Sequence, residues 1–104
     1  MSTTPQTETR RSARPREIQV KVDYLPAAAP FHDRFAPDAT AESVRTAAMA
    51  FFGVQDRQER DTYQYFLECG GNRITDTGQP ISHLVEHGHQ LHCHLVEQIT
   101  PGAV

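Results

Sequence analysis

The sequence predicts an α+β domain of order β-β-α-β-β, in which one central helix packs on a mixed sheet. Three observations support this fold class. Apolar and polar residues alternate over residues 18–23 and 90–99, as in half-buried strands. Between these segments, residues 41–52 alone have the apolar spacing of a long amphipathic helix. The 104 residues suffice for one domain with a thin core.

The first two strands are predicted to form a hairpin. Residues 18–23 read Ile-Gln-Val-Lys-Val-Asp, which places three aliphatic side chains on one face of a strand. Residues 25–30 read Leu-Pro-Ala-Ala-Ala-Pro and predict a loop, because the two prolines disfavour a continuous strand. Phe31 to Phe35 then returns as the second strand, although its alternation is weak.

The helix has signals at both ends. Thr40 is a good N-cap because its hydroxyl can accept a hydrogen bond from a free amide of the first turn, and Glu42 suits the positive helix end. Gly53 is typical of the residue that ends a helix. The face expected to meet the sheet consists of Val44, Ala47, Ala48, Phe51 and Phe52.

The second half of the chain predicts two further strands. Gln55 to Asp61 is wholly polar and is expected to be an exposed connection. Thr62 to Cys69 is the third strand, and Gly70-Gly71-Asn72 is a turn. Residues 74–84 are expected to be irregular with one 3₁₀ turn, and Gln90 to Ile99 is the fourth strand.

Composition divides the chain into three segments. Residues 1–16 are predicted to be a disordered arginine-rich tail, 17–99 the folded domain and 100–104 a flexible C-terminal tail. Four arginines and Glu8 give residues 1–16 a net charge of +3. Because the net charge of the whole chain is −3, residues 17–104 carry a net charge of −6. A solubilising role is favoured for the tail, and the acidic body argues against a nucleic-acid partner. No membrane-length apolar stretch and no secretory leader occur, which predicts a cytoplasmic protein without a membrane partner.

Three fragments carry a family resemblance. Pro37-x-x-Thr40-x-Glu42-x-Val44 resembles the strand-to-helix junction of ubiquitin. Residues 74–82 resemble its Leu-Glu-Asp-Gly turn with one residue inserted, and residues 91–96 resemble its last strand. Together, over residues 18 to about 100, these fragments resemble the ubiquitin-like β-grasp family, of the bacterial modifier type.

The resemblance implies a protein modifier that has no catalytic residue and needs no cofactor. Gly102 falls where a modifier's terminal glycine stands, Pro101 replaces the penultimate glycine, and Ala103-Val104 would be removed by a processing metalloprotease. The other implied partners are an adenylating activating enzyme, a conjugating enzyme and the target proteins. Two alternatives stay open: a non-conjugating β-grasp adaptor, and a sulfur carrier whose terminal glycine becomes a thiocarboxylate.

The outward sheet face is the predicted partner-binding surface. By resemblance it comprises Phe66, Glu68, Gly71, Asn72, His94 and Val96. The carboxylate of Glu68 within this apolar area favours a dedicated partner that offers an arginine, since burying an unpaired charge is costly. Lys21 is the single lysine, so extended lysine-linked chains of this protein are not expected.

Histidines cluster late in the chain. His83, His87, His89, His92 and His94 lie within twelve residues. His92 and His94 share a strand face and could share a metal ion, but a surface cluster without a metal is the favoured interpretation. Cys69 and Cys93 point inward on strands expected to be adjacent; reduced thiols that pack as small apolar groups are favoured over a disulfide.

Overall fold

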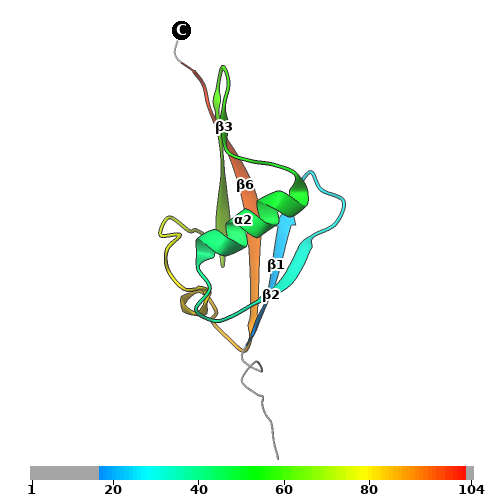
Figure 1. Cartoon of the computed structure of the whole chain (residues 1–104), viewed down its shortest axis with the longest axis vertical. Coiled ribbons are helices and arrows are strands. Elements are labelled where there is room, and N and C mark those ends of the chain that lie inside the picture. Colours follow the sequence, from blue (N-terminus) through cyan, green and yellow to red (C-terminus); the bar gives the residue numbers. More distant parts are fainter. Residues whose placement is uncertain (1–16, 103–104) are drawn as a thin grey trace, which may run out of the picture.

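The computed structural model describes residues 17–102 and confirms an α+β fold with one central helix on a mixed, curled sheet (Figure 1). The predicted tail of residues 1–16 and the last two residues lie outside the described residues. The elements in chain order are β1 (Ile18–Tyr24), β2 (Phe31–Phe35), α2 (Ala41–Phe52), β3 (Arg57–Gln58), β4 (Thr62–Cys69), β5 (Asn72–Arg73), the 3₁₀ helix η3 (Ile81–His83) and β6 (Gln90–Thr100).

The sheet has the strand order β2-β1-β6-β4-β3, and β5 pairs with β4. Parallel pairing joins β1 to β6 at the centre, whereas the other strand pairs are antiparallel. In Figure 1, β6 runs through the middle of the sheet and extends past α2 towards the β3–β4 hairpin. The last strand therefore runs the length of the described domain and ends beside the β3–β4 hairpin.

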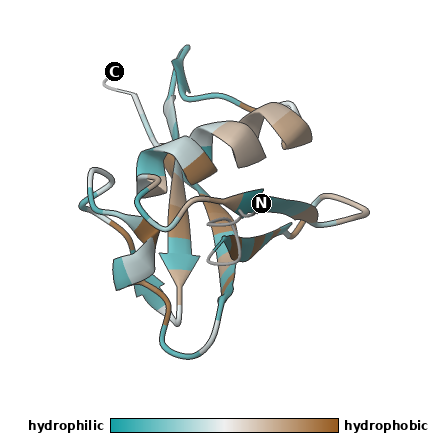
Figure 2. Ribbon diagram, turned by 60° about the horizontal axis from the view of Figure 1, so that its bottom comes forward, coloured by the Kyte–Doolittle hydropathy of each residue, from teal (hydrophilic) through white to brown (hydrophobic). Residues whose placement is uncertain are grey.

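The core lies between α2 and the inner face of the sheet. Val20 and Val22 of β1 and Cys93 of β6 are at most 1% exposed, as the predicted alternation requires. Ile81 of η3 closes one end of the core and is fully buried. Figure 2 shows apolar residues on the strands beneath the helix. Within residues 17–102, no helix is long and apolar enough to cross a membrane.

The helix begins and ends where the sequence predicts. Thr40 is the N-cap, and its Oγ1 accepts a hydrogen bond of 3.1 Å from the amide of Ser43. Gly53 has a φ of 73° and donates its amide to the carbonyl of Ala50, as expected for a glycine at a helix C-terminus. Both capping predictions are confirmed.

The predicted apolar face of α2 is wrong at Phe51. Its side chain is 56% exposed, although its ring contacts that of Phe31 at a centroid distance of 5.6 Å. The helix buries Val44 and Ala48 of the predicted face, and it also buries Ala41 and Met49. Phe51 lies at the edge of this stripe, whereas Phe52, the next residue, packs against the ring of Tyr24 on β1 at a centroid distance of 5.2 Å.

Two short strands occur where the sequence predicts loops. Arg57 and Gln58, in the expected exposed connection, pair with residues 62 and 63 at the start of β4. Asn72 and Arg73 pair with Cys69 and Glu68 at its end. Strands of two residues are too short to show an alternating pattern, so the sequence carried no signal for them.

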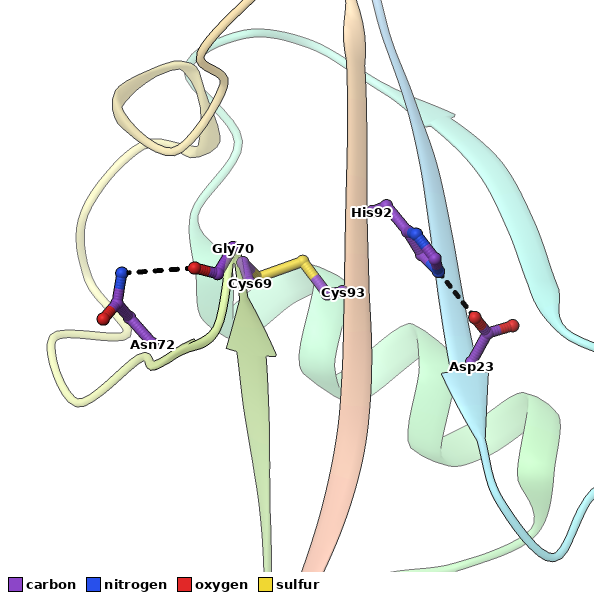
Figure 3. The surroundings of a disulfide bond; sticks show 6 residues. All are labelled: Asp23, Cys69, Gly70, Asn72, His92 and Cys93. Atoms are coloured by element: carbon purple, nitrogen blue, oxygen red, sulfur yellow. Dashed lines mark hydrogen bonds and ion pairs between the residues drawn. A yellow bond between two sulfur atoms is a disulfide. The ribbon is translucent and has the colours of Figure 1, made fainter.

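The expectation of reduced thiols is also wrong, because Cys69 and Cys93 form a disulfide with an S–S distance of 2.06 Å. The two residues are direct cross-strand partners on β4 and β6, and both point into the core. Their Cα atoms are 4.2 Å apart, a separation typical of the close antiparallel pairs that do not exchange backbone hydrogen bonds. Figure 3 shows the bond between the two strands.

Candidate functional site

The segment after β6 brings Gly102 against the β3–β4 connection. Thr100 is the last residue of the strand and pairs with Thr62, so the ladder extends one residue beyond its predicted end. Pro101 is exposed, while Gly102 is half-buried and donates its amide to Oδ1 of Asp61 at 3.1 Å. An added Cβ at Gly102 would overlap the carbonyl oxygen of Arg60. The described tail is thus docked, and only glycine fits at its last position.

The structure brings four of the six predicted surface residues together. Phe66 and Val96 are direct cross-strand partners, and so are Glu68 and His94. All four lie on the outer face of the sheet, where His94 is exposed and the other three are half-buried. They therefore form one contiguous surface, here called the outer patch.

Gly71 and Asn72 lie beside this patch, at the turn that ends β4. Gly71 has a φ of 82°, a conformation that favours glycine, and it follows Gly70, whose φ is 62°. Asn72 donates its side-chain amide to the carbonyl of Gly70 at 3.5 Å (Figure 3). Both residues are exposed, and their contacts account for the turn.

Arg73 belongs to the outer patch and was missed by the sequence analysis. Its guanidinium lies 4.4 Å from the ring centroid of Phe66, and its Nη2 lies 3.8 Å from Oε2 of Glu68. Nη1 also donates a hydrogen bond of 2.7 Å to the side chain of Gln98. The charge of Glu68 is therefore already countered within the chain, which reduces the expected need for an arginine from a partner. The signal that could have found Arg73 is its register opposite Glu68 on β5.

A shallow groove borders the outer patch on the side of the β1–β2 loop. It has a volume of about 600 Å³, and its lining includes Leu25, Glu68, His94 and Val96. Leu25 is 98% exposed, more than any other large apolar residue described. An apolar side chain held out beside a groove favours contact with another molecule. Leu25 belongs to the segment that the sequence predicts to be a loop, and its pattern indicates no role.

The two candidate metal ligands lie on the same face, His94 within the outer patch and His92 two residues before it on β6. The rings of His92 and His94 have centroids 5.1 Å apart, and both side chains are exposed. Nε2 of His92 lies 2.5 Å from Oδ2 of Asp23 on β1, a contact between residues far apart in the sequence (Figure 3). This hydrogen bond is the main cause of a lowered pKa of the Asp23 carboxyl group. His83, by contrast, lies in η3.

The comparisons with solved structures identify the fold as the ubiquitin-like β-grasp. Ubiquitin of Caldiarchaeum subterraneum superposes with a TM-score of 0.53 at 21% identity, covering 77% of this chain and 94% of that chain. A ubiquitin-like domain of an Arabidopsis thaliana protein gives 0.54 at 13% identity, covering 88% and 87%. A third match, an N-terminal ubiquitin-like domain, gives 0.54 at 14% identity, covering 100% and 98%. These likenesses establish the fold.

Sequence comparison adds no closer relationship. No family model matches the chain, and no curated protein matches it. The particular function must therefore be argued from the residues of this chain and their geometry.

Proposed function

We propose that this chain is a ubiquitin-like protein modifier that is attached to its targets through Gly102. The observation that carries the proposal is the position of Gly102, two residues beyond the end of the central strand β6 of a ubiquitin-like fold. Because it has no side chain, Gly102 suits the narrow channel in which an activating enzyme must reach a carboxylate. The chain supplies the reacting group and the partner enzymes supply the catalysis.

The proposed reaction requires Gly102 to become the last residue. A processing metalloprotease hydrolyses the peptide bond between Gly102 and Ala103. The freed carboxylate attacks the α-phosphate of ATP on the activating enzyme, which releases pyrophosphate and leaves an acyl-adenylate. A thiol of the activating enzyme displaces AMP and holds the chain as a thioester, and a thiol of a conjugating enzyme then displaces the first thiol in a second thioester. An amine of the target protein finally displaces the thiol, which regenerates it and forms an amide bond.

The contacts of Gly102 must be broken before an activating enzyme can bind the tail. Its docked position depends on one hydrogen bond to Asp61 and on close packing against Arg60. A hydrogen bond to a charged group such as the Asp61 carboxylate contributes about 1.5–3 kcal/mol, so the tail detaches at a cost of about 10- to 150-fold in population. Binding of the detached tail in the channel of the activating enzyme then offsets this free energy.

The second candidate is a non-conjugating adaptor, and one observation favours it. Gly102 packs against the Arg60 carbonyl, where no larger residue fits. This packing explains a glycine at this position without any conjugation. An adaptor of this fold would bind a dedicated protein partner through the outer patch and Leu25, whose exposed apolar surface lies beside the groove. A sulfur carrier shares the adenylated Gly102 with the modifier and differs in its thiocarboxylate product.

Two variants of the docked tail distinguish the modifier from the adaptor. Gly102→Ala and Asp61→Ala both release the tail, the first by steric overlap and the second by loss of the hydrogen-bond acceptor. Only the first changes the residue that would be attached. In the cells that produce this protein, we expect Asp61→Ala to form covalent adducts at least as well as the unmodified chain, and Gly102→Ala to form at least about tenfold fewer, a difference of about 1.4 kcal/mol in the barrier.

The readout is the set of higher-mass species on denaturing gels, identified by mass spectrometry. Equal adduct formation by Gly102→Ala and Asp61→Ala would contradict attachment through Gly102. Recovery of both variants with the same non-covalent partner and without adducts would identify the adaptor instead.

A further inference from the structure

Asp23, His92 and His94 form a three-residue cluster on the outer face of the sheet. Asp23 comes from β1 and the two histidines from β6, and these strands are paired in parallel with Asp23 opposite His94. Alternate residues of a strand share a face, which places His92 and His94 side by side. Figure 3 shows the His92 ring directed at the Asp23 carboxylate. The central β1–β6 pairing thus fixes all three Cα positions.

The ligand atoms are spaced for one small ion. One nitrogen from each histidine and one oxygen of Asp23 all lie within 4.8 Å of one another, and the shortest separation is the 2.5 Å between His92 and Asp23. A tetrahedral zinc ion with bonds of 2.0–2.2 Å holds its ligand atoms about 3.4 Å apart. The observed separations lie on both sides of this value. Side-chain exposures of 53% for His92 and 34% for Asp23 leave room for the rotations that would equalise them.

Charged residues on β1 and β4 flank the three-residue cluster. Asp23 supplies a carboxylate that lies against His92 and is able to act as a zinc ligand. Lys21 stands opposite His92 in the β1–β6 register and opposes a cation there. Glu68 stands opposite His94 on β4, but Arg73 engages its carboxylate. The cluster therefore offers three protein ligands.

We propose that Asp23, His92 and His94 bind one Zn²⁺ ion, with a water molecule as the fourth ligand. Two imidazoles and one carboxylate suit zinc, whereas Mg²⁺ and Ca²⁺ prefer all-oxygen sites. Asp23 and His94 also line the groove beside Leu25, so the water position is accessible from the outer patch. The site is independent of conjugation, because it lies on the sheet face and does not involve Gly102.

The test is a zinc titration of the full chain without an affinity tag, in competition with a chromophoric chelator near neutral pH. We expect one Zn²⁺ per chain and no response to Mg²⁺. His94→Ala and Asp23→Asn should each weaken zinc binding by about tenfold or more, since even changes beyond the direct ligands reach that size. His87→Ala is the matched control, because it removes an exposed histidine outside the cluster and should leave the affinity unchanged.

Three results would overturn the site. These are zinc affinities of His94→Ala and Asp23→Asn equal to that of the original chain, a loss of the same size in His87→Ala, or several equivalent ions per chain. Each would mean that zinc binds the histidine-rich region without a defined ligand set. Circular dichroism establishes that each variant is folded, and His94→Gln provides a second ligand deletion if His94→Ala does not fold. When zinc is added to the original chain, the NMR signals of the His92 and His94 rings should shift before those of the other histidines.

Discussion

Reduction of the Cys69–Cys93 disulfide should lower the free energy of unfolding by about 3.5 kcal/mol. The bond joins residues separated by 24 positions, and closing a loop of this length restricts the unfolded chain by about that amount. A large share of the stability of a small domain therefore depends on one cross-link. The measurement is urea unfolding of the same protein with and without a thiol reductant.

Comparison of the two redox states isolates the cross-link better than a substitution does, because reduction removes no heavy atom from the buried site. Cys93 is fully buried and Cys69 is 6% exposed, so the folded state should keep its packing after reduction. A matched control is the Cys69→Ala, Cys93→Ala double variant, whose stability should be insensitive to the reductant. A difference below about 1 kcal/mol between the oxidised and reduced protein would contradict a stabilising disulfide.

Replacement of Tyr65 by alanine should destabilise the domain by about 3–5 kcal/mol, the range for removal of a large buried aromatic side chain. Tyr65 is 1% exposed, and its hydroxyl donates a hydrogen bond of 2.7 Å to Glu97. Its ring also meets that of Tyr24 edge-on, at a centroid distance of 6.3 Å. Urea unfolding measures the loss, and Tyr63→Ala on the same strand, where the side chain is only half-buried, should cost clearly less. Equal losses at the two positions would contradict the central place of Tyr65 in the core.

The variant Tyr65→Phe distinguishes the contribution of the hydroxyl group to stability from that of the ring. This variant keeps the buried ring and should lose about 1.5–3 kcal/mol of stability, the contribution of a hydrogen bond to a charged group such as the Glu97 carboxylate. Burial, followed by the hydrogen bond to Glu97, raises the pKa of Tyr65 above its ordinary value of 10.0. A raised pKa means that the folded state holds the proton more tightly, so this stability is present below pH 10 and is lost as the pH rises through the higher folded value. The alkaline loss of stability should therefore be smaller in Tyr65→Phe.

Local patterns in the sequence were sufficient to predict the helix and the long strands. Thr40 and Gly53 are residues whose own chemistry caps a helix, and the alternation around Val20 and Val22 identifies a buried strand face. Such signals lie within a few neighbouring residues. Phe51 shows their limit, because helical spacing defines an apolar stripe but does not say which residues at its edge the sheet covers.

The features that were missed depend on pairing between distant segments. The inward positions of Cys69 and Cys93 were predicted, but the exact register that makes them direct partners was not. Arg73 reaches Glu68 and Phe66 only because a two-residue strand folds back on β4. Asp23 meets His92 across 69 positions of sequence, so the histidine cluster alone could not reveal its third member.

The central claim, attachment through Gly102, is tested most directly by the intact mass of the chain recovered from the cells that make it. The account predicts a processed species that ends at Gly102, together with heavier species in which the Gly102 carboxyl group is joined to an amine of another protein. A chain that retains Ala103 and Val104 and carries no attachment under every growth condition would contradict it.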